Sequence, residues 1–221
     1  KNKRVLITGA SNGLGRVCAE KFASLGAQLV ITGRNIDKLE ELKYSFSDPD
    51  KHSIFAGDLT APKACQKLIA RAKSFLGKID AVLHIAGGGY GFRDPLLTWE
   101  QLETLYKVNV SIAAEINRLV VPSMVEQKKG FVVHVGSVAS QEATASVGYN
   151  TVKASLAAYV RSLGREMAHT GVIITGILPG AFYAPGNSWR RLEENKPAVV
   201  KEFIKKNLPR KKIADASEVI P

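Results

Sequence analysis

The stretch that decides the fold is Val5-Leu6-Ile7-Thr8-Gly9-Ala10-Ser11-Asn12-Gly13-Leu14-Gly15. A short apolar run, typical of a buried strand, leads through a Gly-x-x-x-Gly-x-Gly loop into a helical pattern. Glycine there allows a tight turn, close approach of a diphosphate, and close packing of helix on strand. The helix N-terminus adds unpaired N–H groups and a partial positive charge. We therefore expect a nucleotide at this loop, contacted by Gly9, Ser11, Asn12, Gly13, Leu14 and Gly15.

Short apolar runs alternate with longer helical patterns along the rest of the chain. We expect strands at residues 4–7, 28–32, 53–56, 81–85, 131–135 and 172–177. We expect helices at residues 13–25, 37–44, 62–75, 98–125 (interrupted near Asn109) and 147–169. Thr98 with Gln101, and Asp37 with Glu40, have the spacing of helix starts. The alternation predicts an α/β, doubly wound parallel sheet (a Rossmann fold) covered on both faces, in a single domain of residues 1–221.

The composition narrows the class of protein. The chain has 221 residues, of which 45% are hydrophobic and 23% charged, so that disordered, collagen-like and disulfide-scaffold classes are excluded. Cys18 and Cys65 fall in helical patterns, which favours free thiols and a cytoplasmic location. No apolar run approaches a membrane span, and the N-terminus does not resemble a signal peptide, so no membrane partner is expected. No metal site is expected either.

The net charge is +11, and the basic residues are unevenly placed. Between Trp189 and Lys212 nine basic residues stand against three acidic ones, which indicates either a solvated helical face or a surface for an anionic ligand. A nucleic-acid partner is not expected, because no aromatic-interleaved basic sheet or recognition helix is present. Residues 184–212 are polar and helical and have no expected strand partner. We interpret residues 182–210 as a lid inserted over the carboxyl edge of the sheet.

Further motifs follow the later strands: Gly57-Asp58-Leu59-Thr60, Lys107-Val108-Asn109-Val110, Gly136-Ser137, Tyr149-Asn150-Thr151-Val152-Lys153 and Pro179-Gly180. With the glycine loop, they make the chain resemble the short-chain dehydrogenase/reductase family over nearly its whole length, in particular 3-oxoacyl-carrier-protein-reductase-like members. The resemblance implies strand order 3-2-1-4-5-6, a seventh strand beyond Pro221, and a homodimer or homotetramer. One departure is His84-Ile85-Ala86-Gly87, where the family usually has Asn-Asn-Ala-Gly.

Tyr149 and Lys153 are the central catalytic candidates. They are four residues apart in a helical pattern and so share one face. A nearby ammonium stabilises a phenolate, so we expect Lys153 to lower the pKa of Tyr149. The resemblance implies that Tyr149 donates the proton to a carbonyl and that Lys153 also holds the nicotinamide ribose. It further implies that Ser137 hydrogen-bonds the substrate oxygen and that Asn109 holds a water of a proton relay.

The end of the second strand indicates which nicotinamide cofactor is used. Gly33 stands where NAD enzymes place an acidic residue on the ribose 2′-hydroxyl, and Arg34 offers a guanidinium for a 2′-phosphate. Asn35 adds a hydrogen-bonding group, whereas Asn12 is neutral where many NADP-using members carry a second basic residue. NADP(H) is thus favoured over NAD(H), and ketone reduction over alcohol oxidation. The remaining cofactor contacts that the resemblance implies are Asp58, Leu59, Ala86, Gly87, Tyr149, Lys153, Pro179 and Gly180.

A substrate pocket is expected where the carboxyl ends of strands 4 to 6 meet the lid. Its substrate-contacting candidates are Ser137, Gln141, Tyr149, Phe182, Tyr183 and Trp189. Aromatic rings beside arginines suit a partly apolar, anionic ketone or aldehyde. A carrier-linked 3-oxoacyl chain fits, and so does a nucleotide-linked or surface-polysaccharide sugar. The aromatic residues could equally form the core of the lid. A non-catalytic dinucleotide sensor is the other reading, and the complete Ser137, Tyr149 and Lys153 set argues against it.

Overall fold

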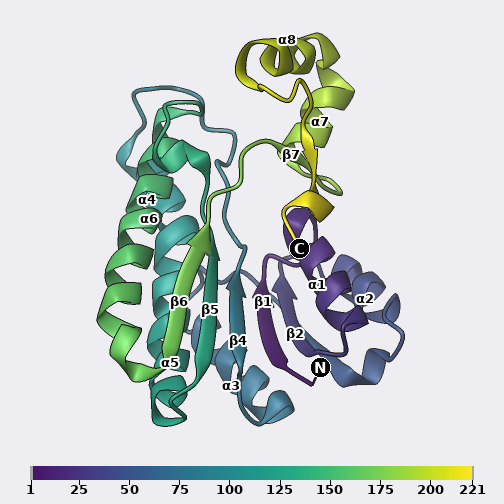
Figure 1. The fold of residues 1–221 in the computed structure, drawn as a ribbon, viewed down its shortest axis with the longest axis vertical. Helices are drawn as coiled ribbons and strands as arrows, with labels where there is room; N and C mark the ends of the chain where they lie inside the picture. The colour runs from purple at the N-terminus through teal and green to yellow at the C-terminus, as the bar shows by residue number, and fades with distance from the viewer. Residues whose placement is uncertain (1, 221) are drawn as a thin grey trace.

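The computed structural model describes residues 2–220. Its centre is a six-stranded parallel sheet with the order β3-β2-β1-β4-β5-β6, which confirms the predicted topology (Figure 1). The strands are β1 (Arg4–Thr8), β2 (Gln28–Gly33), β3 (His52–Ala56), β4 (Ala81–His84), β5 (Gly130–Val135) and β6 (Val172–Ile177). Each is within about two residues of its predicted range, because short apolar runs mark buried parallel strands clearly.

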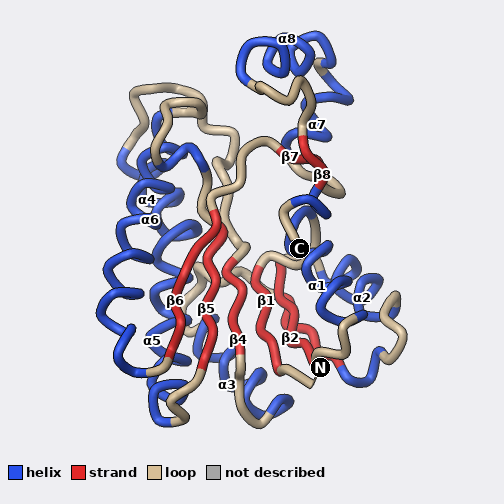
Figure 2. Tube along the Cα trace, viewed as in Figure 1, coloured by secondary structure: helices blue, strands red, loops and turns tan. Residues whose placement is uncertain are grey.

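Helices lie on both faces of the sheet (Figure 2). One face packs against α3 (Ala64–Leu76), α5 (Ile112–Glu126) and α6 (Val147–Met167) in a core that includes Leu6, Val82 and Ile116. The other packs against α1 (Gly13–Ser24) and α2 (Ile36–Tyr44). Short 3₁₀ turns cover Pro49–Lys51, Val138–Ser140, Ala168–Thr170 and Ala216–Glu218. Among residues 2–220, no helix is long and apolar enough to cross a membrane.

Helices pack on both faces as expected, but within the described residues they cover the second face unevenly. The helices α1 and α2 lie over β1 and β2, and no helix of residues 2–220 lies over this face at β5 and β6 (Figure 1). Exposure alternates along β5 and along the first half of β6, and Phe131 and Ile173 are 36% and 54% exposed.

Two helix details depart from the sequence expectations. The expected interruption near Asn109 is a π-helical turn, Lys107–Ser111, between α4 (Trp99–Tyr106) and α5, so the helix widens there without ending. The start of α2 is capped by Asn35, whose Oδ1 accepts from the Lys38 amide, and not by Asp37. The expected capping box of Thr98 and Gln101 is confirmed at α4.

The late part of the chain forms a separate projection above the sheet (Figure 1). Its helices are α7 (Ser188–Asn195) and α8 (Pro197–Asn207). At its base β7 (Phe182–Tyr183) pairs in parallel with β8 (Ala214–Asp215). No strand occurs within the predicted unpaired segment, residues 184–212, but this short pair flanks it and was not predicted. Two-residue strands give too short an apolar run to be recognised in a sequence.

Candidate active site

The glycine loop packs against the carboxyl end of β4. Gly9 adopts φ +72°, and a Cβ on it would lie 2.8 Å from the Ala86 nitrogen. A Cβ on Gly15 would overlap the Gly9 carbonyl oxygen, so α1 can start this close to β1 only with glycine there. Leu14 is buried below the loop. The Gly13 amide donates to the Pro185 carbonyl at 2.7 Å, so the late segment reaches the start of α1.

The end of β4 is held by Thr8, which is nearly fully buried. Its hydroxyl accepts from the amides of Ile85 and Ala86 at 3.0 and 3.2 Å and donates to the Leu83 carbonyl at 3.4 Å. The departure from the family pattern at Ile85 therefore leaves these two amides paired.

Asn109 anchors the loop that follows β4. Its Nδ2 donates to the carbonyls of Gly88 at 3.0 Å and Leu105 at 2.9 Å, and its Oδ1 accepts from the Gly88 amide at 3.1 Å. A Cβ on Gly87 would lie 2.7 Å from Asn109 Oδ1 and 3.6 Å from Lys153 Nζ. Both polar atoms of the Asn109 side chain are therefore already hydrogen-bonded to backbone groups. The predicted relay water would have no free amide group of Asn109 to bind.

Ser137, Tyr149 and Lys153 come together at the carboxyl end of β5. Ser137 follows β5 and caps a 3₁₀ turn, while Tyr149 and Lys153 lie on the first two turns of α6. The Ser137 hydroxyl lies close enough to the Tyr149 side chain to lower the pKa of the phenol. Lys153 Nζ lies 5.6 Å from the centre of the Tyr149 ring and donates to the Val135 carbonyl at 3.0 Å. The three groups therefore face one small volume beside the Gly87 loop.

The pKa values differ from the expectation. Burial raises the pKa of Tyr149, and the nearby Ser137 hydroxyl offsets part of that rise. Burial also lowers the pKa of Lys153 to about 8. The prediction that Lys153 lowers the pKa of Tyr149 was therefore wrong for this structure, because desolvation of the phenol is the dominant effect.

The packing at the end of β2 leaves no room for an acidic side chain at position 33, which is Gly33. A Cβ on Gly33 would lie 2.8 Å from the Ser11 hydroxyl oxygen, so the two side chains compete for the same space. Arg34 Nη1 donates to the Tyr90 hydroxyl at 3.2 Å, and its guanidinium lies 5.7 Å from the ring centre. Arg34 thus bridges from β2 to the loop after β4.

Lys38 is a basic residue that the sequence reading missed. Its Nζ donates to Asn12 Oδ1 at 2.9 Å, which places an ammonium group on the glycine loop. Many NADP-using members of the family carry a basic residue at the position of Asn12. In this chain Lys38, on α2, places a positive charge beside that position instead. Lys38 lies one helical turn beyond Arg34, and that spacing alone does not show that it reaches back to the loop.

The other predicted cofactor contacts lie at neighbouring strand ends. Asp58 Oδ1 accepts from the amide and hydroxyl of Thr60, which, with a smaller effect of Arg34, lowers the Asp58 pKa. Leu59 is partly buried against the core. Pro179 accepts from the Val138 amide at 3.2 Å, so Pro179 and Gly180 lie next to Ser137.

Most of the predicted substrate contacts lie apart from Tyr149. Trp189 packs against Phe203 inside the α7–α8 pair, with ring centres 4.4 Å apart. Tyr183 donates to Glu193 and lies under Arg190, and Phe182 packs against the α1 core. Gln141 lines a cavity of about 390 Å³ between α6 and β6. The structure thus favours the lid-core reading for Trp189.

Comparisons with known proteins agree with this architecture. A family model described as short chain dehydrogenase matches residues 3–195. An uncharacterised oxidoreductase of Staphylococcus epidermidis is 30% identical over 186 residues, which cover 84% of this chain and 80% of the relative.

Two solved structures with bound cofactors share the fold. A 3-oxoacyl (acyl-carrier-protein) reductase from Agrobacterium tumefaciens with NADP bound is 23% identical, with a TM-score of 0.89, and covers 100% of this chain and 85% of its own. A 7α-hydroxysteroid dehydrogenase complexed with NADH and 7-oxo glycochenodeoxycholic acid is 23% identical, with a TM-score of 0.88, covering 98% and 84%.

Proposed function

The chain belongs to the short-chain dehydrogenase family, and from this premise we propose that it is an NADP(H)-dependent oxidoreductase that reduces a ketone or aldehyde to an alcohol. The observation that carries the proposal is the convergence of Ser137, Tyr149 and buried Lys153 beside the Gly87 loop. A nicotinamide cofactor, when bound, supplies the hydride.

The residues around the glycine loop fit a dinucleotide. At Gly9, Gly15 and Gly87 the backbone packs so closely against neighbouring residues that any Cβ would collide with protein atoms. The start of α1 provides the partial positive charge that a diphosphate requires. Together with Asp58 at the end of β3 and Pro179 after β6, these residues line one edge of the sheet, where ligands of doubly wound folds bind.

In this reaction Tyr149 acts as the proton donor. Because burial keeps its phenol protonated at neutral pH, Tyr149 Oη is ready to give a proton to a carbonyl oxygen as that oxygen gains charge. The Ser137 hydroxyl holds the same oxygen and stabilises the developing charge. The Lys153 ammonium supplies positive charge beside Tyr149 and orients the ribose hydroxyls. A raised phenol pKa suits reduction better than oxidation, which needs a phenolate.

The preference for NADP(H) rests on two cations. Arg34 directly follows β2 and donates to Tyr90, while Lys38, on α2, donates to Asn12 of the glycine loop. The 2′-phosphate of NADP(H) would be held by these two cations. A guanidinium and an ammonium give charge-assisted hydrogen bonds, each worth about 1.5–3 kcal/mol. No side chain is available at Gly33 to repel the phosphate.

The α7–α8 projection is proposed as the substrate lid. It carries most of the basic residues between Trp189 and Lys212 and stands above the carboxyl ends of the strands (Figure 1). This charge favours an anionic carbonyl substrate, such as a carrier-linked acyl chain, over a neutral one.

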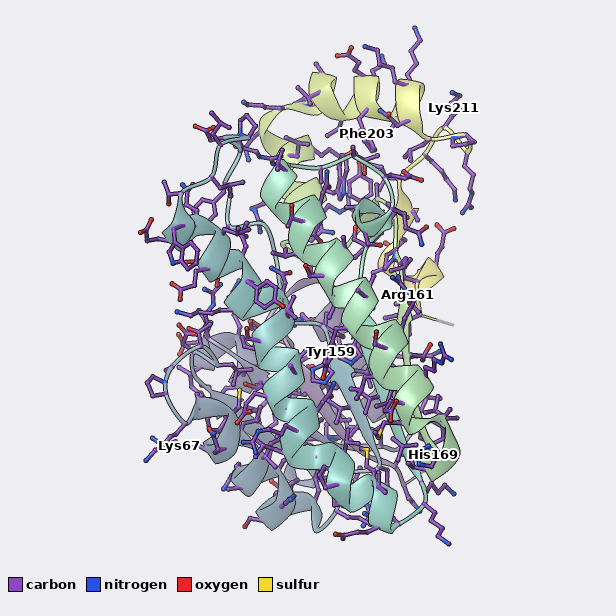
Figure 3. All side chains as sticks on the ribbon, turned by 90° about the vertical axis from the view of Figure 1, so that its left-hand side faces the viewer. Lys67, Tyr159, Arg161, His169, Phe203 and Lys211 are labelled. Atoms are coloured by element: carbon purple, nitrogen blue, oxygen red, sulfur yellow. The ribbon has the colours of Figure 1, made fainter. Side chains whose placement is uncertain are left out.

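The cofactor proposal is tested by fluorescence titration of the protein with NADPH and NADH. We expect Arg34→Ala and Lys38→Ala each to weaken NADPH binding by about tenfold or more, with NADH binding little changed. Lys67→Ala removes the same charge as a control, because Lys67 (labelled in Figure 3) is an exposed lysine of α3, which packs on the other face of the sheet from α2. Equal losses for both nucleotides would contradict the 2′-phosphate assignment.

The catalytic proposal is tested with a panel of ketones and aldehydes. Removal of one hydroxyl in Tyr149→Phe should lower kcat by about 100-fold or more while NADPH binding is retained. A Tyr149→Phe variant with undiminished turnover would remove Tyr149 from the mechanism.

A further inference from the structure

Two histidines are stacked inside the protein directly behind the proposed active site. His84 ends β4 and His134 lies in β5, and they are paired across the two strands. Their side chains are 5% and 1% exposed. The ring centres are 4.5 Å apart and the planes differ by 18°. Neither residue has a part in the proposed chemistry, and buried imidazoles are costly unless they are hydrogen-bonded.

The amide of Asn117, on α5, lies between the two rings and the Tyr159 hydroxyl. Asn117 Oδ1 lies 2.8 Å from His84 Nε2, so this imidazole nitrogen carries a proton and donates. Asn117 Nδ2 lies 3.2 Å from His134 Nε2 and 3.0 Å from the Tyr159 hydroxyl oxygen, so His134 Nε2 is bare and accepts. One amide thus holds two neutral imidazoles in opposite tautomers.

This cluster of His84, Asn117, His134 and Tyr159 joins four elements that carry the site. His84 precedes the Ile85–Gly87 segment, and His134 precedes Val135, whose carbonyl accepts from Lys153 Nζ. Tyr159 is on α6, the helix that also carries Tyr149 and Lys153, and lies between α5 and α6 (Figure 3). The hydrogen bonds therefore fix α6 against β4 and β5.

Within residues 2–220, the cluster is faced by the ammonium of Lys153, and the cavity that His134 lines also contains Arg161 and Arg165 but no carboxylate. His134 faces Lys153 and Tyr159 from α6, His84 from β4, uncharged Asn117 from α5, and Gly176 from β6. Burial lowers the pKa of His84, and the hydrogen bond with Asn117 offsets part of that fall. Burial likewise lowers the pKa of Lys153. A proton on His134 Nε2 would break its bond with Asn117 and add a second positive charge close to Lys153.

We propose that His84 and His134 are positioning residues that hold Lys153 and the Gly87 loop in place only while both imidazoles are neutral, and so set the acid limit of cofactor binding and turnover. The proposal rests on the proposed reductase function for turnover, whereas its effect on NADPH binding can be measured without turnover.

The decisive variant is Asn117→Asp, which keeps the shape but replaces the Nδ2 donor with a carboxylate oxygen. A carboxylate favours the protonated imidazole, so the acid limbs of NADPH binding and of kcat/KM should both move upward by at least about one pH unit, a tenfold change at fixed pH on the limb. Asn2→Asp adds the same charge at the chain's exposed start and should leave both limbs in place. In His84→Asn with His134→Asn, where the amides keep hydrogen-bonding groups without titrating, the limb should move to lower pH.

The protonation itself is read by NMR of the imidazoles in the protein without substrate. The chain has four histidines, so His84 and His134 are identified by the signals that their Asn variants lose. We expect neither to titrate near the ordinary histidine value in the wild type, and both to titrate at higher pH in Asn117→Asp.

Imidazole titration and NADPH binding that shift together support the proposal, even if no carbonyl compound is reduced and the reductase function fails. Imidazoles that shift while the binding limb stays at the wild-type pH overturn it and leave the reductase function standing. Ordinary titration of either histidine in the wild type also overturns it.

Discussion

The buried histidine at the end of β4 makes the folded protein sensitive to acid. Burial lowers the pKa of His84 from 6.5 to about 4. As the pH falls, the unfolded chain therefore takes up this proton first, and the native state loses stability between about pH 6.5 and pH 4. The gap corresponds to roughly 3 kcal/mol in all, of which about 2 kcal/mol is lost by about pH 5. That is a large part of the stability of an ordinary domain, about 5–15 kcal/mol.

The perturbation is His84→Asn, which keeps a donor for Asn117 Oδ1 and removes the titrating group. Urea unfolding, followed by circular dichroism at about pH 7 and about pH 5, gives the free energy of unfolding of both proteins. The wild type should lose about 2 kcal/mol more than the variant over this interval, because all carboxylates are common to both. Equal losses would show that His84 is protonated in the native state near pH 6 and would refute the reasoning.

Three substitutions test other parts of the structure. Gly15→Ala should destabilise the fold by about 1–3 kcal/mol in urea unfolding and abolish NADPH binding, because the new methyl overlaps the Gly9 carbonyl; unaltered binding would contradict this. Thr8→Val leaves two partly buried amides without a partner and should cost about 1–3 kcal/mol in the same assay, and a neutral effect would mean that water replaces the hydroxyl. Trp189→Ala removes the contact with Phe203 and should raise the KM for a carbonyl substrate several-fold without weakening NADPH binding; a matching loss of NADPH affinity would place Trp189 at the cofactor instead.

Local patterns were sufficient to predict the strands of the parallel sheet, whereas their order followed from the family resemblance. Each apolar run of β1 to β6 lies within one short stretch of sequence, as does the glycine spacing from Gly9 to Gly15. Such patterns can be recognised without knowledge of contacts between distant segments. The spacing of Tyr149 and Lys153 likewise predicted that they share a helix face, and both lie beside Ser137.

Features that depend on contacts between distant segments were not predictable. Lys38 reaches Asn12 from 26 positions away, and only the packing of α2 beside the glycine loop brings them together. The direction of the Tyr149 pKa depends on how much protein surrounds the phenol, which no spacing reports. The uneven cover of the second face within residues 2–220 was likewise not predictable, because β5 and β6 are apolar runs like the other strands.

The pairing of β7 with β8 separates the chain into two parts that can change independently. The two short strands bring residues 183 and 215 side by side, so everything between them is a closed loop tied at its base. The base is packed on α1 through Ala184 and Ala216, whereas α7 and α8 contact each other more than they contact the sheet. Residues 188–207 can therefore be exchanged or lengthened during evolution while the sheet and the glycine loop keep their sequence, and under the proposed function such changes alter which carbonyl compounds are accepted.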